Sequence, residues 1–115
     1  MVRLVHVRTG REIARLEIAR STLQRMRGLL GRSGLPSGQG MLIERCSSIH
    51  TFFMKFALDV IFLDSDRAVR RVVRGLRPWR LAGSPGASCV VELAAGALEG
   101  TDLAAGDALR IEEIP

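Results

Sequence analysis

Apolar and polar positions alternate through the first eighteen residues and predict two short strands. Residues 2–7 alternate around Val2 and Leu4 and end at the turn signal Thr9-Gly10. Residues 13–18 follow with a similar strand-like pattern, although this second stretch also fits a helix. Together the two runs indicate an N-terminal β-hairpin.

The next segment changes to helical spacing. Four apolar residues recur every one to three positions along it: Leu23, Met26, Leu29 and Leu30. Ser21 is a favourable N-cap, and Gly31 is a plausible stop. Gly28 lies inside this stretch, where glycine costs about 1 kcal/mol relative to alanine. We therefore expect one main helix after Ser21, with another segment approaching it closely at Gly28.

Short strands separated by turns account for most of the remaining chain. Predicted strands cover residues 41–43, 59–63, 69–73, 89–93 and 108–112. Residues 33–39 and 75–86 are predicted loops, and residues 94–103 a helical turn or two. Strands that arrive as hairpins argue against a parallel doubly wound sheet. We expect a single domain over residues 1–115 of the α+β, β-rich class, with a compact curled or barrel-like antiparallel sheet and one main short helix packed on it.

The composition is that of an ordinary globular domain. Hydrophobic residues make up 47% and charged residues 25% of the chain. No apolar run approaches the roughly 20 residues that span a bilayer, and Arg3, Arg8 and Arg11 interrupt the N-terminal segment, unlike a signal peptide. We therefore expect a cytoplasmic protein without a membrane partner. Two cysteines, Cys46 and Cys89, are too few for a typical disulfide-stabilised secreted domain.

The basic charge is less informative than its size suggests. Seventeen basic and twelve acidic residues give a net charge of +5, but sixteen of the basic residues are arginine and only Lys55 is lysine. That skew is typical of a biased codon composition. The basic residues also spread from Arg3 to Arg110. We expect no specific nucleic-acid partner, although the arginine-rich hairpin at residues 67–80 leaves a nucleic-acid-binding module as an alternative.

Cys46 and His50 are the first candidates for chemistry. They are four residues apart, and a thiol within reach of an imidazole is the minimum for an activated cysteine nucleophile. A metal site that uses Cys46, His50 and Asp59, completed by His6 and Cys89 from distant segments, is another alternative. The more ordinary interpretation is an unreactive, largely buried Cys46 and a His50 that bonds the backbone, with no metal or cofactor.

Asp59 and Trp79 are the other informative positions. Asp59 lies inside the apolar run 56–63, where an unpaired charge is costly, so we expect its side chain to be more than half buried and hydrogen-bonded. It either bonds backbone N–H groups or faces a ligand. Trp79 stands between Arg77-Pro78 and Arg80 and forms either an aromatic platform for an anionic group or a lid over the core.

Three blocks, in order, resemble a known family. They are Arg27-Gly28-Leu29-Leu30-Gly31-Arg32 with Gly40-Met41-Leu42; Met54-Lys55 with residues 58–64; and residues 91–96 with residues 103–107. Together they resemble the prokaryotic domain of unknown function 192. Ala57 and Ala94 stand where that family often has proline. The resemblance implies a compact β-rich domain and no assigned activity.

The combined interpretation is a small binding domain with a pocket for a small polar or anionic ligand or a peptide. An enzyme that uses Cys46 and His50 in thiol or metal chemistry remains an alternative. The predicted ligand-binding residues are Cys46, His50, Thr51, Met54, Lys55, Asp59, Arg77, Trp79 and Glu92.

Overall fold

The computed structural model describes the backbone of residues 1–115 and every side chain except that of Thr22. The described chain forms nine strands and one helix. Their bounds are β1 Val2–His6, β2 Glu12–Ala19, α1 Thr22–Leu29, β3 Gln39–Glu44, β4 Ser48–His50, β5 Leu58–Leu63, β6 Val69–Leu76, β7 Leu81–Gly83, β8 Cys89–Ala94 and β9 Leu109–Glu113. The chain is α+β and β-rich, as predicted.

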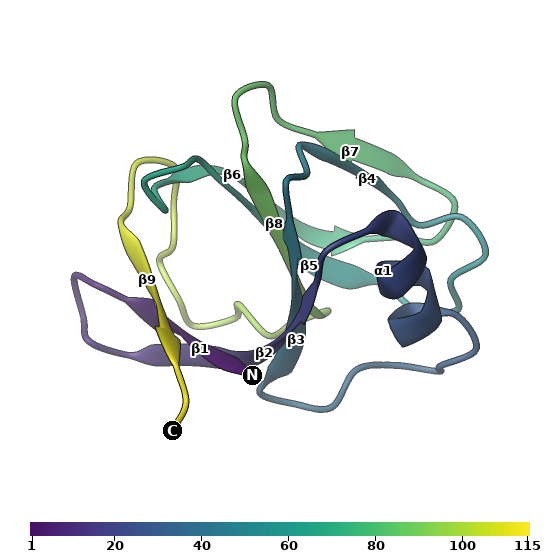
Figure 1. The fold of residues 1–115 in the computed structure, drawn as a ribbon, viewed down its shortest axis with the longest axis horizontal. Coiled ribbons are helices and arrows are strands. Elements are labelled where there is room, and N and C mark those ends of the chain that lie inside the picture. The colour runs from purple at the N-terminus through teal and green to yellow at the C-terminus, as the bar shows by residue number, and fades with distance from the viewer.

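Seven strands form one strongly curled sheet in the order β6-β5-β8-β3-β2-β1-β9 (Figure 1). The curl brings the two edge strands together at one end, where Ala68 bridges Ala108 and the Leu109 N–H donates to the Arg67 carbonyl at 3.0 Å. Strands β2 and β3 are parallel, with α1 in the connection between them, and the other pairs are antiparallel. The prediction of a curled sheet is confirmed, and the sheet is antiparallel except at this one pair.

Strands β5 and β8 are buried on both faces along almost their whole length. All six residues of β5 are buried because each face of the strand lies in a separate hydrophobic core. One core contains side chains of β1, β2 and β9. The other contains Leu29 of α1, Ile49 of β4 and Met54. Neighbouring residues on β5 and on β8 therefore point into different cores.

Helix α1 confirms two predictions and corrects a third. The Ser21 hydroxyl accepts the Gln24 N–H at 3.2 Å, as an N-cap does. A β-carbon at Gly28 would collide with the methyl group of Met41, so the predicted close approach is present. The buried face is formed by Arg25 and Leu29, however, and Leu23 is 59% exposed.

No helix of the described chain is long and apolar enough to cross a membrane.

Two other segments differ from the predictions. Residues 95–100 form successive turns rather than a helix, with Gly96 and Gly100 in the left-handed region at φ +89° and +76°. The predicted loop at residues 75–86 contains β7, which pairs with β4 in a separate two-stranded sheet.

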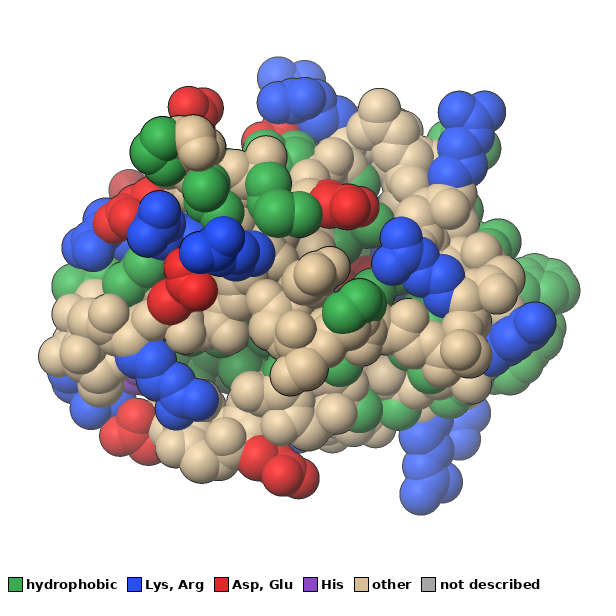
Figure 2. All heavy atoms as spheres, turned by 90° about the horizontal axis from the view of Figure 1, so that it is seen from below, with side chains coloured by type: hydrophobic (Ala, Val, Ile, Leu, Met, Phe, Trp, Pro, Cys, Tyr) green, Lys and Arg blue, Asp and Glu red, His purple; other side chains and the backbone are tan. Residues whose placement is uncertain are grey.

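Charged side chains are mixed on the face of the molecule seen in Figure 2. Acidic groups lie between basic ones there, and single basic side chains project from several places. On that face the charge is distributed rather than gathered into one basic stripe.

Candidate functional site

Asp59 is a buried carboxylate held entirely by backbone groups. It is 2% exposed and accepts N–H groups from Gly75 at 2.9 Å, Gly96 at 3.1 Å and Leu98 at 3.0 Å. The predictions of burial and hydrogen bonding are confirmed. Of the two interpretations offered by the sequence, the one with bonds to backbone N–H groups describes the observed geometry. The carboxylate fixes the turns that follow β8 against the end of β6.

Glu92 on β8 is buried in a different way. It is fully buried, and its Oε1 lies 2.6 Å from Nε of Arg25, which is itself 3% exposed. The second carboxylate oxygen, Oε2, is buried and has no hydrogen-bond partner in the protein. Burial raises the pKa of Glu92, and the Arg25 guanidinium acts in the opposite direction without cancelling the effect.

Arg25 keeps most of its hydrogen-bonding capacity. Its Nη1 and Nη2 atoms face thioether sulfurs, Sδ of Met26 at 3.7 Å and Sδ of Met54 at 3.8 Å. A guanidinium has five N–H donors and a thioether is a weak acceptor. Because one strong acceptor, Glu92, occupies Nε, the two Nη groups remain able to bind an oxygen anion.

A cavity of about 260 Å³, the Arg25 pocket, opens beside this guanidinium. Its lining combines Arg25, Cys46, Ser48 and His50 with the apolar residues Ile43, Ile49 and Leu81. Helix α1, strand β3 and the β4–β7 pair contribute to the walls. The arrangement is a small apolar cavity with one buried cation at its wall.

Cys46 and His50 both line this pocket, but backbone groups occupy their reactive atoms. The Cys46 thiol donates to the Ser48 carbonyl at 3.0 Å, and His50 Nδ1 accepts the Phe52 N–H at 3.3 Å. Accepting that N–H places the proton of the neutral imidazole on Nε2. Cys46 is a free, partly buried thiol, so it is less enclosed than the sequence predicts.

The alternative metal site is not assembled. His6 Nε2 lies 3.3 Å from Asp107 Oδ2, and Cys89 Sγ accepts from Arg67 Nη1 at 3.0 Å, whereas Asp59 binds backbone groups. Among the described residues, no group of three or more His, Cys, Asp or Glu side chains is placed to hold a metal ion. The proposed ligands therefore lie in separate places.

Other predicted site residues form a neighbouring surface. Thr51 is fully buried and bonds the backbone of residues 77–80, while Lys55 and Arg77 are exposed. Trp79 is 55% exposed and stacks on Phe52, with ring centroids 5.8 Å apart. The prediction of Trp79 as a lid over the core is therefore wrong.

The structure thus divides the nine predicted residues into three places. Cys46 and His50 line the Arg25 pocket, and Met54 and Glu92 contact Arg25 itself. Asp59 lies on the face of β5 that carries Ile61 and Leu63 of the other core. The remaining four residues belong to the neighbouring surface: Thr51, Lys55, Arg77 and Trp79. Arg25 was missed. The sequence signal for it is Glu92, an acid inside an apolar strand that requires a cationic partner, but the sequence does not say which arginine supplies it.

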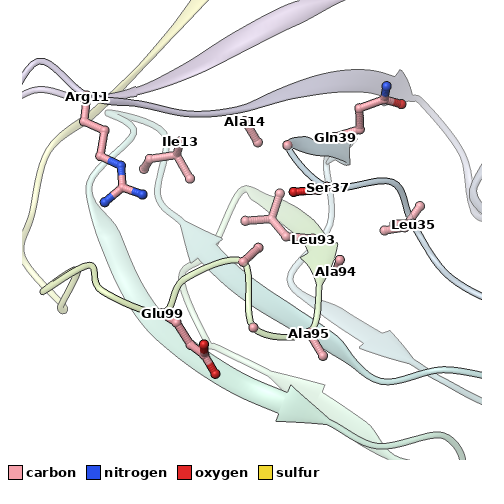
Figure 3. A pocket seen from close by; sticks show the side chains of 13 residues that line it. Arg11, Ile13, Ala14, Leu35, Ser37, Gln39, Leu93, Ala94, Ala95 and Glu99 are labelled. Atoms are coloured by element: carbon pink, nitrogen blue, oxygen red, sulfur yellow. The ribbon is translucent and has the colours of Figure 1, made fainter.

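A larger cavity of about 580 Å³ offers a ligand no buried charged side chain (Figure 3). Its floor is formed by small apolar side chains and backbone at Ala14, Gly38 and residues 94–97. Its two charged side chains, Arg11 and Glu99, are both exposed. A cavity of about 300 Å³ beside Asp59 also contains Arg74, whose Nη atoms donate to the Leu98 and Leu103 carbonyls. The Arg25 pocket is therefore the candidate site.

Sequence comparisons identify similar proteins without an assigned activity. Residues 5–111 match the family model of the domain of unknown function 192, described as "Uncharacterized ACR". A UPF0127 protein from Thermococcus sibiricus (strain DSM 12597 / MM 739) is 34% identical over 98 residues, which are 81% of this chain and 63% of that protein. A UPF0127 protein from Pyrococcus abyssi (strain GE5 / Orsay) is 54% identical over 35 residues, 30% of this chain and 29% of that protein. The chain thus spans less than two thirds of each relative's length.

Two solved structures share the fold. A protein from Sinorhizobium meliloti 1021, described as a candidate transcription regulator, has a TM-score of 0.80 and 27% identity, with 96% of this chain and 91% of that chain covered. A protein of unknown function from Novosphingobium aromaticivorans DSM 12444 has a TM-score of 0.79 and 24% identity, with 95% and 82% covered. The second likeness bears on the fold alone.

Proposed function

Because the chain belongs to the domain of unknown function 192 family, whose description assigns no activity, we propose its function from the Arg25 pocket. The protein is a binding domain for a small ligand with a carboxylate head and a short apolar body. The observation that carries this proposal is the buried guanidinium of Arg25, whose two Nη groups face only thioether sulfurs, in a residue that lines a cavity.

Charge supports an anionic head. A guanidinium binds a carboxylate through two parallel N–H bonds, and such bonds are strong in a dry site. Glu92 offsets the charge of Arg25 through Nε, and burial raises the pKa of Glu92. The two Nη groups of Arg25, which face thioether sulfurs, remain as donors for the incoming carboxylate.

The walls support a short apolar body. Ile43 and Ile49 are buried, and Leu81 lies at the mouth with 73% of its surface exposed. Each methylene group that such walls cover contributes about 0.8 kcal/mol. A volume of about 260 Å³ limits the ligand to a small molecule or one terminal residue of a peptide.

Titration calorimetry with acetate, butanoate, hexanoate and hexanol tests the proposal. We expect affinity to rise from acetate to hexanoate and to be lost with hexanol, which has the same chain but no charge. Tripeptides ending in leucine, with a free or an amidated C-terminus, show whether a peptide carboxylate also enters. Equal binding of hexanol and hexanoate contradicts an arginine-held head group.

Paired variants locate the site. Arg25→Gln/Glu92→Gln removes both buried charges and is expected to abolish hexanoate binding. Arg27→Gln removes a charge from an exposed position of the same helix and is expected to leave binding unchanged. Unchanged hexanoate binding in the double variant contradicts the proposal.

The description of the Sinorhizobium relative raises nucleic-acid binding as a second function. We do not favour it for the arginine-rich hairpin, because three of its arginines make contacts inside the chain. Arg67 donates to Cys89 Sγ, Arg71 to the Gly83 carbonyl and Arg74 to the Leu98 carbonyl. A gel-shift assay at physiological salt that shows sequence-selective binding contradicts this preference.

A further inference from the structure

A second surface lies beside the Arg25 pocket, where the segment after β4 meets the segment before β7. We call it the aromatic–basic surface: Phe53, Lys55, Arg77, Trp79, Arg80 and Leu81. In Figure 1 these two segments lie at the right-hand end of the molecule. Phe53, Trp79 and Leu81 are 66%, 55% and 73% exposed, and the rings of Phe53 and Trp79 are in contact with centroids 4.7 Å apart. A cluster of large exposed apolar side chains marks a site of interaction.

Thr51 holds both segments in place from beneath. It is fully buried, and its hydroxyl donates to the Arg77 carbonyl at 2.6 Å and accepts the Arg80 N–H at 2.9 Å. Its carbonyl accepts the N–H groups of Trp79 at 3.0 Å and Met54 at 3.2 Å. These bonds tie residues 51–54 to residues 77–80, so the aromatic side chains sit on a fixed base.

The backbone under the two aromatics is strained. Phe53 and Trp79 have φ values of +66° and +63°, in the left-handed region that bulky residues avoid. Such conformations persist only where surrounding bonds impose them, and they concentrate at binding sites. The Thr51 bonds therefore preorganise Phe53 and Trp79 outside the core.

The two segments that form this surface carry only positive charge. Lys55, Arg77 and Arg80 are exposed, and residues 45–58 and 67–91 contain no Asp or Glu. A surface that combines exposed aromatics with basic residues complements a partner that is apolar inside and negatively charged at its boundary. That description fits the headgroup region of an anionic lipid bilayer.

We propose that the aromatic–basic surface docks the protein peripherally on anionic membranes. Phe53, Trp79 and Leu81 enter the interface, where tryptophan is favoured, and the three basic side chains contact lipid phosphates. Single-stranded nucleic acid fits less well, because Leu81 offers no stacking face and Phe53 and Trp79 partly cover each other. The expectation of no membrane partner rested on the lack of a spanning segment, which does not bear on peripheral contact.

Trp79 is the only tryptophan, so its fluorescence reports directly on this surface. Vesicles of phosphatidylcholine are compared with vesicles that also contain phosphatidylglycerol. We expect a blue shift of Trp79 emission and co-sedimentation only with the anionic vesicles, and both are expected to weaken as salt rises. Equal binding to both kinds of vesicle, or binding without a blue shift, overturns the proposal.

Matched variants separate this surface from overall charge. Lys55→Gln/Arg77→Gln/Arg80→Gln is expected to weaken vesicle binding about tenfold or more. Arg8→Gln/Arg11→Gln/Arg27→Gln removes the same charge from other exposed positions and is expected to change it much less. Phe53→Ser/Leu81→Ser is expected to abolish the blue shift, and Leu23→Ser, at another exposed leucine, to preserve it. Equal losses in the two charge variants, or tighter binding of a single-stranded oligonucleotide that displaces vesicles, refute the proposal.

Discussion

Two carboxylates, Asp59 and Glu92, lie on the neighbouring strands β5 and β8 and are equally buried, yet their surroundings differ. Asp59 accepts three backbone N–H groups. Glu92 has one arginine partner and one oxygen without a partner. Backbone donors hold a carboxylate for structure, whereas a side-chain partner such as Arg25 can divide its bonds between the protein and a ligand. The comparison shows that burial alone does not identify a binding site.

The pleat of the sheet separates the two groups. Asp59 pairs with Leu93, and Glu92 pairs with Val60, so the carboxylates point to opposite faces. Asp59 meets the turns after β8, which offer free N–H groups. Glu92 meets α1, where Arg25 takes the place of an apolar residue on the buried face.

Breaking the Glu92 pair gives the largest expected effect. Arg25→Gln leaves a buried carboxylate without its cation and is expected to lower the free energy of unfolding by about 3–5 kcal/mol. Arg25→Gln/Glu92→Gln is expected to recover most of that loss, because no charge remains buried. Urea unfolding measures both, with Arg27→Gln as the exposed control. Equal losses in the single and double variants contradict a coupled pair.

Removing the Asp59 carboxylate has the next largest effect. Asp59→Ala leaves three N–H groups without their acceptor and is expected to lower the free energy of unfolding by about 1–3 kcal/mol. Hexanoate binding by the folded protein is expected to stay unchanged, since Asp59 faces the other core. Asp66→Ala, in the exposed turn after β5, serves as control. A loss within about 0.5 kcal/mol, typical of surface sites, or weakened hexanoate binding contradicts the structural role.

The pH dependence of stability tests the Glu92 pair in a second way. Burial raises the pKa of Glu92 above its ordinary value of 4.5, so the folded protein binds this proton more tightly than the unfolded chain does. The resulting stabilisation is complete below the unfolded pKa and is lost as pH rises through the folded pKa. We expect the stability of the wild type relative to Arg25→Gln/Glu92→Gln to fall from pH 4.5 upward. Urea unfolding at a series of pH values measures this difference in stability. If the difference rises with pH instead, Arg25 lowers the pKa of Glu92 by more than burial raises it.

The smallest expected effect concerns the thiol beside the Glu92 pair. Cys46 is expected to react slowly with iodoacetamide at neutral pH, and His50→Ala is expected to leave that rate unchanged, because backbone groups occupy both reactive atoms. Mass spectrometry follows the modification. Cys89 is the internal reference, since it is 1% exposed and burial raises its pKa. Fast alkylation that depends on His50 moves the enzyme hypothesis to first place.

The two carboxylates also show how far the sequence could lead. The burial of Asp59 was predictable because charges inside apolar strands must be satisfied. The three N–H donors of Asp59 were not predictable. They depend on turns around Gly96, in a segment for which the sequence predicted a helical turn. Glu92 was identified as a site residue, but its partner is one of sixteen arginines. The leucine spacing of α1 also indicated the wrong face.

Short elements escaped prediction for a different reason. Strands β4 and β7 have three residues each, too few for a period-two pattern to be recognised. They nevertheless contribute a wall of the Arg25 pocket and adjoin the aromatic–basic surface. The longer apolar runs did predict β5 and β8, because these strands are buried along almost their whole length.

The pairing of β1 with β9 bears on how quickly the protein can fold. Val2 lies opposite Glu113, so this ladder joins strands from distant parts of the chain. Until β9 is in place, β1 presents a row of free N–H and C=O groups that invites association with another chain. Sheets built from distant pairings fold on the scale of milliseconds to seconds. The β1–β9 ladder therefore makes folding depend on a distant pairing and, once formed, covers an edge of β1 that could otherwise associate with another chain.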